Sequence, residues 1–282
     1  MSEIVNPNLS GIPETLLIPL YCRAVESQRP DALVKDERAV ELMNRIDYNF
    51  SWIKFSSADM LFTIMRVREF DRHTQAFLAA YPDGIVVSIG CGLDTRFDRV
   101  DNGMVEWYDL DLPEVIALRR QLVAETPRCR FIECSMLDFA WMDIVGGNAN
   151  RPCLFLAEGV FPYFGEAEVR RLVLALQARF PGAELVFDAM TPFMVWLHSH
   201  HPAISKLHAH LWGIKGGQEL ETWSPGIRLL DEWFYFDRPE PRLGWTRLMR
   251  FVPLLNQGNS IVRYQLGEPS QAGGCDPPYE TC

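Results

Sequence analysis

The stretch VVSIGCGLDTRFDRV, residues 86–100, holds the residues with the clearest chemical potential in this sequence. A run of β-prone residues leads into Gly90 and Gly92, with Cys91 between them. Glycines at the end of a strand permit a tight turn and allow a ligand to touch the main chain. Such a pair also occurs in ordinary turns, so its interpretation depends on the residues that follow.

Acidic residues follow at the spacing that nucleotide-binding sheets use. Asp109 and Asp111 stand 19 and 21 positions after Gly90, and an acid about 20 positions on can bind ribose hydroxyls. Thr95 replaces the third glycine of the dinucleotide fingerprint, and Asp94 places a carboxylate where a diphosphate would lie. A carboxylate repels a diphosphate and attracts a sulfonium or ammonium group. The pattern therefore favours S-adenosylmethionine, which carries positive charge and no phosphate.

The carboxylate of S-adenosylmethionine would need a cation. Arg66 lies among apolar neighbours on a predicted helix. A partly desolvated guanidinium there would form a strong bidentate pair with a carboxylate. The alternative is a solvated helix face, on which Arg66 pairs with Glu69 or Asp71.

The segments that must position these residues alternate between strands and helices. Five apolar stretches predict strands: GIVVSIG (84–90), MVEWYDLDL (104–112), CRFIECSM (129–136), CLFLAEGV (153–160) and AELVFDAM (183–190). Helices are predicted over 113–125, which Pro113 opens, and over 165–180. This alternation predicts a parallel α/β sheet with helices on both faces.

The flanking segments have a different character. Helical spacing over 13–28, 36–46 and 57–81 predicts an N-terminal helical cap, residues 1–82, ahead of the cofactor-binding core, residues 83–190. Residues 191–265 would form the acceptor cap and closing strands, with 228–236 and 259–267 pairing antiparallel at the sheet edge. We expect one domain over 1–265 and a flexible tail over 266–282.

Composition excludes several classes of function. The chain has 282 residues, of which 48% are hydrophobic, enough for a large core, and a net charge of −10 that argues against nucleic-acid binding. No apolar run is long enough to span a membrane. The start MSEIVNPNLSGIPETLL has neither a basic end nor a long hydrophobic stretch, so we expect a cytoplasmic protein. The seven cysteines form no CxxC pair. Five lie in apolar or strand-like stretches and suggest buried thiols, and Cys275 and Cys282 lie in the tail with no assigned role.

Several motifs together resemble the leucine carboxyl methyltransferase family, and within it the bacterial polyketide O-methyltransferases of the tetracenomycin type. They are TLLIPLYCRAVESQRPD, the helix of Arg66, SIGCGLDTRF, YDLDLPEV and LAEGVFPYF. The resemblance covers roughly residues 12–265. It implies a class I, Rossmann-like methyltransferase fold with a seven-stranded, mostly parallel sheet of order 3-2-1-4-5-7-6, a helical insertion after strand 5, and dependence on S-adenosylmethionine.

The resemblance also implies roles for single residues. Arg66 is similar to the residue that binds the methionine carboxylate, and Gly90 to the main-chain contact, with Cys91, Gly92 and Asp94 in the same loop. Asp111 resembles the ribose-binding acid and is preferred to Asp109. Glu158 resembles the acid that faces the methionine moiety, although a buried acid with a structural partner is the alternative.

One position departs from the family pattern. The family has an acid and an apolar residue after strand 3, which flank the adenine, whereas this chain has Ser135 and Met136. Ser135 could bond the adenine amino group and Met136 could pack on the ring. Asp138 is the alternative partner for the adenine.

The acceptor side is less defined by the sequence. Five of the six histidines lie at 198–210, and His198 and His201 are candidate acceptor-site groups, with surface or packing roles as the alternative. Tyr21 and Arg23 are further candidates, and Arg23 could equally form a structural ion pair. Methyl transfer from a sulfonium needs no metal, so we expect none.

These observations predict an S-adenosylmethionine-dependent O-methyltransferase. The expected acceptor is a small, aromatic, polyketide-like molecule, methylated on a carboxyl or hydroxyl oxygen. The alternatives are a protein C-terminal carboxyl methyltransferase, a non-catalytic scaffold with the same fold, and a nicotinamide oxidoreductase. The oligomeric state is left open.

Overall fold

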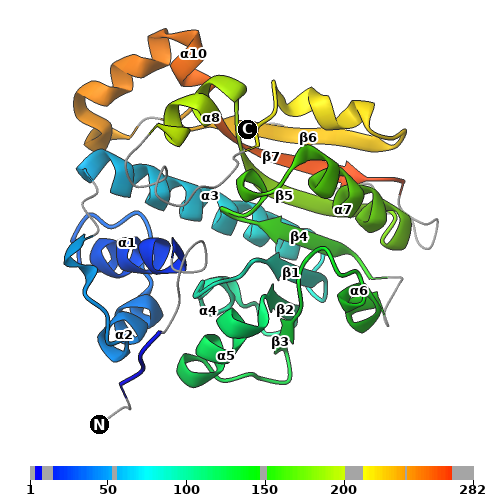
Figure 1. Ribbon diagram of the computed structural model, residues 1–282, viewed down its shortest axis with the longest axis horizontal. Helices are drawn as coiled ribbons and strands as arrows, with labels where there is room; N and C mark the ends of the chain where they lie inside the picture. The colour runs from blue at the N-terminus through cyan, green and yellow to red at the C-terminus, as the bar shows by residue number, and fades with distance from the viewer. Residues whose placement is uncertain are drawn as a thin grey trace.

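The computed structural model describes residues 4–7, 15–52, 56–146, 151–200, 212–238 and 240–268. Its centre is one seven-stranded sheet in the order β3-β2-β1-β4-β5-β7-β6 (Figure 1). The strands are β1 (Ile85–Ile89), β2 (Glu106–Asp111), β3 (Cys129–Glu133), β4 (Cys153–Ala157), β5 (Ala183–Met190), β6 (Ile227–Phe234) and β7 (Asn259–Leu266). β7 runs antiparallel to both β5 and β6, and the other neighbouring pairs are parallel.

The central strands are covered on both faces, which explains their unbroken apolar sequences. Every residue of β1 and β4 is buried. Ile85, Val87 and Ile89 point into a core shared with α7 (Glu166–Arg179), whereas Val86 points into the core shared with α3 (Ser57–Ala80). The parallel strands end at one edge of the sheet, and this edge positions the candidate site.

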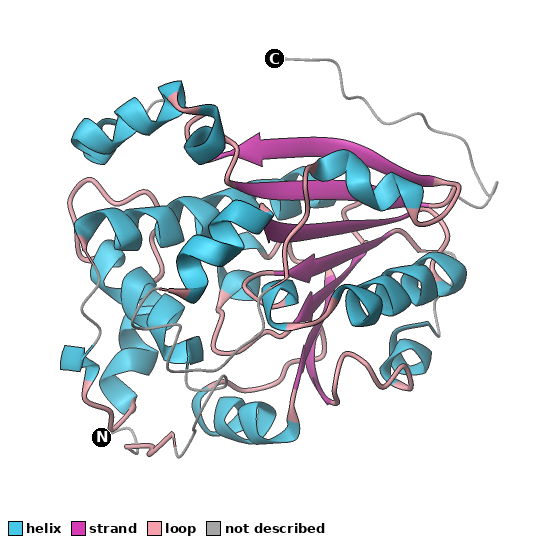
Figure 2. Cartoon of the chain, turned by 45° about the horizontal axis from the view of Figure 1, so that its top comes forward, coloured by secondary structure: helices cyan, strands magenta, loops and turns pink. Residues whose placement is uncertain are grey.

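Of the N-terminal helices, the first two lie beyond that edge, on the side toward which the parallel strands point, and the third packs along one face of the sheet (Figure 2). They are α1 (Leu17–Ser27), α2 (Glu37–Arg45) and the long α3, whose first turn is closed by a capping box between Ser56 and Asp59. Arg23 of α1 donates a hydrogen bond to the carbonyl of Leu93, and Thr95 donates one to Asp36. These buried bonds join the helical cap to the loop after β1.

The remaining elements are short. The α-helices are α4 (Arg96–Val100), α5 (Pro113–Leu122), α6 (Trp141–Val145), α8 (Pro192–Ser199) and α10 (Pro253–Asn256). The 3₁₀ segments are η2 (Phe50–Trp52), η4 (Phe161–Tyr163), η5 (Gly217–Thr222) and η6 (Pro241–Phe251). No helix among the described residues is long and apolar enough to cross a membrane.

The fold class predicted from the sequence is confirmed. The sheet order, the antiparallel pairing at its edge and the N-terminal helices all agree with it. Two predicted helices are shorter than expected, since α1 begins at Leu17 and α5 ends at Leu122. The tail predicted to be flexible lies outside the described residues from 269 onward, and the domain boundaries stay a prediction.

Candidate active site

The glycine turn after β1 has the backbone that only glycine adopts easily. Gly90 has φ +64° and Gly92 has φ +50°, both in the left-handed region. A Cβ atom on Gly90 would lie 2.4 Å from Cγ2 of Val160, which follows β4. The N–H groups of Gly90 and Cys91 both donate to the carbonyl of Leu110, at 2.8 and 3.1 Å. The turn is therefore held against the ends of both β2 and β4.

The two aspartates of β2 have different surroundings. Asp109 is buried, and its Oδ2 accepts a hydrogen bond from the buried Arg119 at 2.5 Å. Asp111 is partly exposed, and its oxygens accept from the N–H groups of Gly92 and Leu112, both at 2.7 Å. Burial raises the pKa of Asp111, and these two donors oppose the rise. Asp109 serves the fold, so Asp111 stays the predicted ribose ligand.

Asp94 lies among guanidinium groups. Its carboxylate is 2.6 Å from Arg96 Nη1, 3.2 Å from Arg99 Nη2 and 3.9 Å from Arg23 Nη1. Burial alone would raise its pKa, but these cations hold the pKa of Asp94 well below its ordinary value. Its negative charge is thus compensated by arginines, whereas the sequence argument treated it as free. A contact between Asp94 and the cofactor stays a prediction.

Arg66 joins the ends of two strands. Its Nε donates to Glu158, just after β4, at 3.0 Å, and its Nη1 donates to Asp188 of β5 at 3.1 Å. Neither Glu69 nor Asp71, the partners that the sequence offered as the alternative, is bonded to it. Its Nη2 makes no hydrogen bond within the described residues and lies 3.4 Å from the place of a Cβ on Gly159. This free N–H pair is available to a carboxylate.

Asp188 is a site residue that the sequence analysis missed. It accepts hydrogen bonds from Arg66 and from the N–H of Gly159, the latter at 2.5 Å. Burial raises its pKa, and Arg66 opposes the rise. The signal was present, because Asp188 directly follows the apolar residues 185–187 of a strand predicted to be buried, where an acid is unusual.

The charged side chains around the turn form one network. Arg96 bonds to Asp71 at 2.7 Å and to Glu158 at 2.6 Å, and Arg99 bonds to Asp36 and Asp71. The network links five carboxylates to four guanidiniums: Asp36, Asp71, Asp94, Glu158 and Asp188 with Arg23, Arg66, Arg96 and Arg99. Its excess of negative charge, together with Asp111, favours a cationic ligand over a diphosphate.

The adenine side follows β3. Ser135 is partly exposed, and its hydroxyl accepts a hydrogen bond from the N–H of Leu137 at 3.3 Å. Met136 is buried in the core, and Asp138 is exposed. All three lie just beyond the carboxyl end of β3, as expected. The choice between Ser135 and Asp138 stays a prediction.

The structure places two of the four acceptor-site candidates, Arg23 and Tyr21, and does not describe the side chains of the other two. Arg23 is 2% exposed and bonds to Asp36 at 2.9 Å, so it forms the structural ion pair that the sequence offered as the alternative. Tyr21 stacks on Phe50 with ring centroids 5.7 Å apart. The side chain of His198 and the whole of His201 lie outside the described residues.

Two tyrosines lie close enough to Arg66 for its charge to act on them. The sequence placed Tyr163 among aromatic residues that could line the acceptor pocket, and it did not single out Tyr235. Tyr163 follows β4 and Tyr235 follows β6. Burial raises the pKa of Tyr235, Arg66 opposes the rise, and Asp188 adds to it. Burial likewise raises the pKa of Tyr163, with Arg66 opposing. Both phenols therefore stay protonated and can donate hydrogen bonds near the ends of β4 and β5.

One group of described residues has the spacing of metal ligands. The ligand atoms of Glu69, His73 and Asp231 lie within 4.8 Å of one another. Arg72 Nη2, however, lies 2.5 Å from Glu69 and 3.2 Å from Asp231, so a guanidinium already provides positive charge between the carboxylates. This group is an ion-pair cluster, and the expected absence of a metal stays a prediction.

The site's geometry fits S-adenosylmethionine. Gly90 and Gly92 add no side chains of their own to the turn, Asp111 retains acceptor capacity, and Arg66 retains a free Nη2. A diphosphate would find no unpaired cation at the turn among the described residues, because Arg96 and Arg119 are both bound to carboxylates.

Comparison with known proteins agrees with this geometry. The family model of leucine carboxyl methyltransferases matches residues 17–177. The tetracenomycin polyketide synthesis O-methyltransferase TcmP of Streptomyces glaucescens is 35% identical over 264 residues, covering 91% of this chain and 97% of its own. The S-adenosyl-L-methionine-dependent methyltransferase dpfgK of Gibberella zeae is 29% identical, covering 90% and 93%. A crystal structure of a DUF574 family protein from Streptomyces avermitilis shares the fold with a TM-score of 0.55 at 14% identity, covering 87% and 96%.

Proposed function

Because this chain belongs to the leucine carboxyl methyltransferase family and is an S-adenosylmethionine-dependent methyltransferase, we propose that it methylates an oxygen of a small, aromatic, polyketide-like molecule. Support for the oxygen and for the acceptor class comes from the name of TcmP, which matches this chain over nearly its whole length. The oxygen belongs to a carboxyl or a hydroxyl group.

The observation that carries the proposal is the position of Arg66 between Glu158 and Asp188. In this proposal the free Nη2 of Arg66 binds the methionine carboxylate, and the two acids lie next to the ammonium group. Asp111 holds the ribose, and the main chain of Gly90 and Gly92 allows close approach. When bound, the cofactor supplies a methyl group already activated by the sulfonium.

The chain's own task is then to orient the acceptor and exclude water. Helices α1 and α2 of the cap lie beyond the carboxyl ends of the strands (Figure 2), so they can shield a ligand bound there from water. Tyr163 and Tyr235, both protonated, can hold the acceptor by donating hydrogen bonds. A carboxylate acceptor is already anionic and needs no base, whereas a hydroxyl acceptor would lose a proton during transfer.

The test combines binding with product chemistry. Isothermal titration with S-adenosylhomocysteine measures cofactor binding, and incubation with labelled S-adenosylmethionine and a panel of aromatic hydroxy acids measures transfer. A methyl ester formed at a carboxyl group is released by mild alkali, whereas a methyl ether is stable. Label transfer to the panel supports the proposal, and the alkali step identifies the oxygen.

The alternatives give different results in the same experiment. A non-catalytic scaffold would transfer no label to any acceptor, even if it binds S-adenosylhomocysteine. A protein carboxyl methyltransferase would label a protein C-terminus and leave the small-molecule panel unlabelled. Either result would contradict the proposal.

A further inference from the structure

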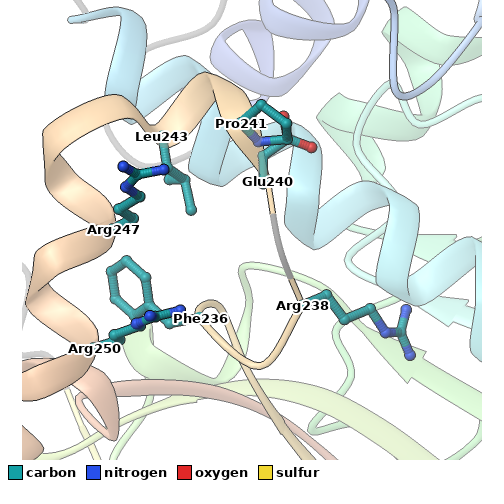
Figure 3. A pocket seen from close by; sticks show the side chains of 7 residues that line it. All are labelled: Phe236, Arg238, Glu240, Pro241, Leu243, Arg247 and Arg250. Carbon is teal, nitrogen blue, oxygen red and sulfur yellow. The ribbon is translucent and has the colours of Figure 1, made fainter.

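A pocket with a volume of about 180 Å³ lies between η6 and the turn after β6 (Figure 3). Its lining residues are Phe236, Arg238, Glu240, Pro241, Leu243, Arg247 and Arg250. Cavities of about 150 Å³ hold a benzene ring in other proteins, so this pocket can accept one ring of a larger molecule.

Aromatic side chains connect the pocket to the candidate active site. Phe62 of α3 contacts Phe236 edge-on, with ring centroids 5.9 Å apart, and contacts Tyr235 in the same way at 5.6 Å. Tyr235 is the phenol whose pKa depends on Arg66 and Asp188. Phe236, Phe62 and Tyr235 thus form a chain of ring contacts that leads from the pocket to Tyr235, directly after β6.

The pocket holds positive charge without compensation. Arg247 and Arg250 form no ion pair and no hydrogen bond within the described residues, and Arg250 only covers the ring of Phe251. The other two charged side chains that line the pocket, Arg238 and Glu240, already have partners. Arg238 points away from it in Figure 3 and bonds to Glu69 at 2.9 Å. Glu240 lies 3.8 Å from Arg68 and accepts a hydrogen bond from the N–H of Arg242.

This local charge contrasts with the whole chain. Residues 241–258 contain three arginines and no acid, whereas the chain has a net charge of −10. Two unpaired guanidiniums beside an aromatic ring are suited to an anionic group attached to a flat ring, since arginine binds carboxylates bidentately and stacks on aromatic faces.

We propose that this pocket is a subsite for an acidic aromatic acceptor, in which Arg247 and Arg250 bind an anionic group distant from the methylated oxygen and Phe236 packs on the ring. The proposal rests on the proposed function, because it narrows the acceptor of that same site. The acceptor's ring system lies along Phe236, Phe62 and Tyr235, and its far end reaches the cofactor.

The test uses 6-hydroxy-2-naphthoate as the probe, because its carboxylate and hydroxyl lie at opposite ends of the ring system. Its neutral amide, 6-hydroxy-2-naphthamide, is the matched ligand. Isothermal titration is carried out with and without saturating S-adenosylhomocysteine. The wild-type protein is expected to bind the acid about tenfold more tightly than the amide, the scale of a charge-assisted hydrogen bond. Equal affinities, or no binding of the acid at millimolar concentration, would overturn the proposal.

Variants of the two pocket arginines test whether the preference for the acid over the amide arises in this pocket. Arg247→Met/Arg250→Met is expected to lose the preference for the acid, and Arg247→Lys/Arg250→Lys to keep part of it. Arg228→Met removes an exposed arginine of β6 that bonds to Gln265, and it should behave as wild type. An unchanged preference in the double methionine variant would place the anion elsewhere.

Affinity for S-adenosylhomocysteine separates this inference from the proposed function. All four proteins are expected to bind it equally, which also shows that the variants are folded. Binding of S-adenosylhomocysteine without acid selectivity would refute the subsite alone. Acid selectivity that depends on the two arginines, without cofactor binding, would refute the proposed function and leave the pocket's ligand class in place.

Discussion

At the scale of single residues, the two aspartates of β2 illustrate how burial gives similar side chains different roles. Asp109 and Asp111 are two positions apart, so they point to the same face of the strand. Only Asp109 has a buried guanidinium partner, Arg119. A functional role and a structural role can therefore be distinguished by substitution.

We predict that Asp111→Asn weakens binding of S-adenosylhomocysteine, because an amide is a poorer acceptor for ribose hydroxyls, and that it lowers stability less than Asp109→Asn does. Asp109→Asn should instead lower the free energy of unfolding by about 3 kcal/mol, since it leaves Arg119 buried without a counter-charge. Titration calorimetry and urea unfolding of both variants check this. The reverse pattern would transfer the ribose role to Asp109.

The second prediction for single residues concerns Arg66. Arg66→Met should weaken S-adenosylhomocysteine binding by about 1.5–3 kcal/mol, the value of a hydrogen bond to a charged group. Titration calorimetry measures the loss. The control is Arg68→Met on the same helix, whose guanidinium lies 3.8 Å from Glu240 and should not contribute. Unchanged affinity in a folded Arg66→Met protein would remove Arg66 from the site.

At the scale of elements, the turn after β1 is the feature whose shape matters most. Gly90 combines a left-handed backbone with close contact to Val160, whereas Gly103 has φ +82° and nothing within 4 Å of its Cβ position. Alanine substitution at Gly103 therefore measures backbone strain alone, whereas alanine substitution at Gly90 measures strain and steric overlap together.

Gly103→Ala should cost about 1 kcal/mol of unfolding free energy, from the backbone alone. Gly90→Ala should cost about 3 kcal/mol, because overlap with Val160 adds to the strain, and it should also weaken cofactor binding. Urea unfolding measures both. Adding Val160→Ala should restore part of the loss at Gly90. An equal loss of unfolding free energy in the two variants would show that the turn after β1 can shift away from Val160 without an energetic penalty.

At the scale of the whole molecule, the interior contains a histidine that links stability to pH. His73 of α3 is 1% exposed, and neither ring nitrogen has a hydrogen-bond partner among the described residues. Burial, and then the positive charge of Arg72, lowers the pKa of His73 to about 3. The folded protein keeps this imidazole neutral at pH values where the unfolded chain protonates it.

Stability should therefore fall as the pH drops below about 6.5, the ordinary histidine pKa. The expected loss is about 2 kcal/mol between pH 6.5 and 5, because only the unfolded state gains a proton in that window. Urea unfolding at several pH values measures the slope. His73→Leu should flatten it, and His200→Gln, at an exposed position, should not. A slope that persists in His73→Leu would assign the effect to other groups.

The sequence by itself determined the elements and their order. Apolar runs such as GIVVSIG and CLFLAEGV predict buried strands because both faces of a covered sheet exclude water, and Pro113 marks the start of α5. The glycine pair and Asp111 could be named because they depend on local backbone geometry and on a fixed spacing along one β-α-β unit.

Only the tertiary structure decided which charges meet. Arg66 binds Glu158 and Asp188, which stand 92 and 122 positions away, whereas the sequence offered its neighbours Glu69 and Asp71. Arg23 likewise bonds to Asp36 and to the carbonyl of Leu93, 13 and 70 positions away. Electrostatic energy depends on separation in space and on exclusion of water, and neither quantity is defined until the chain has folded.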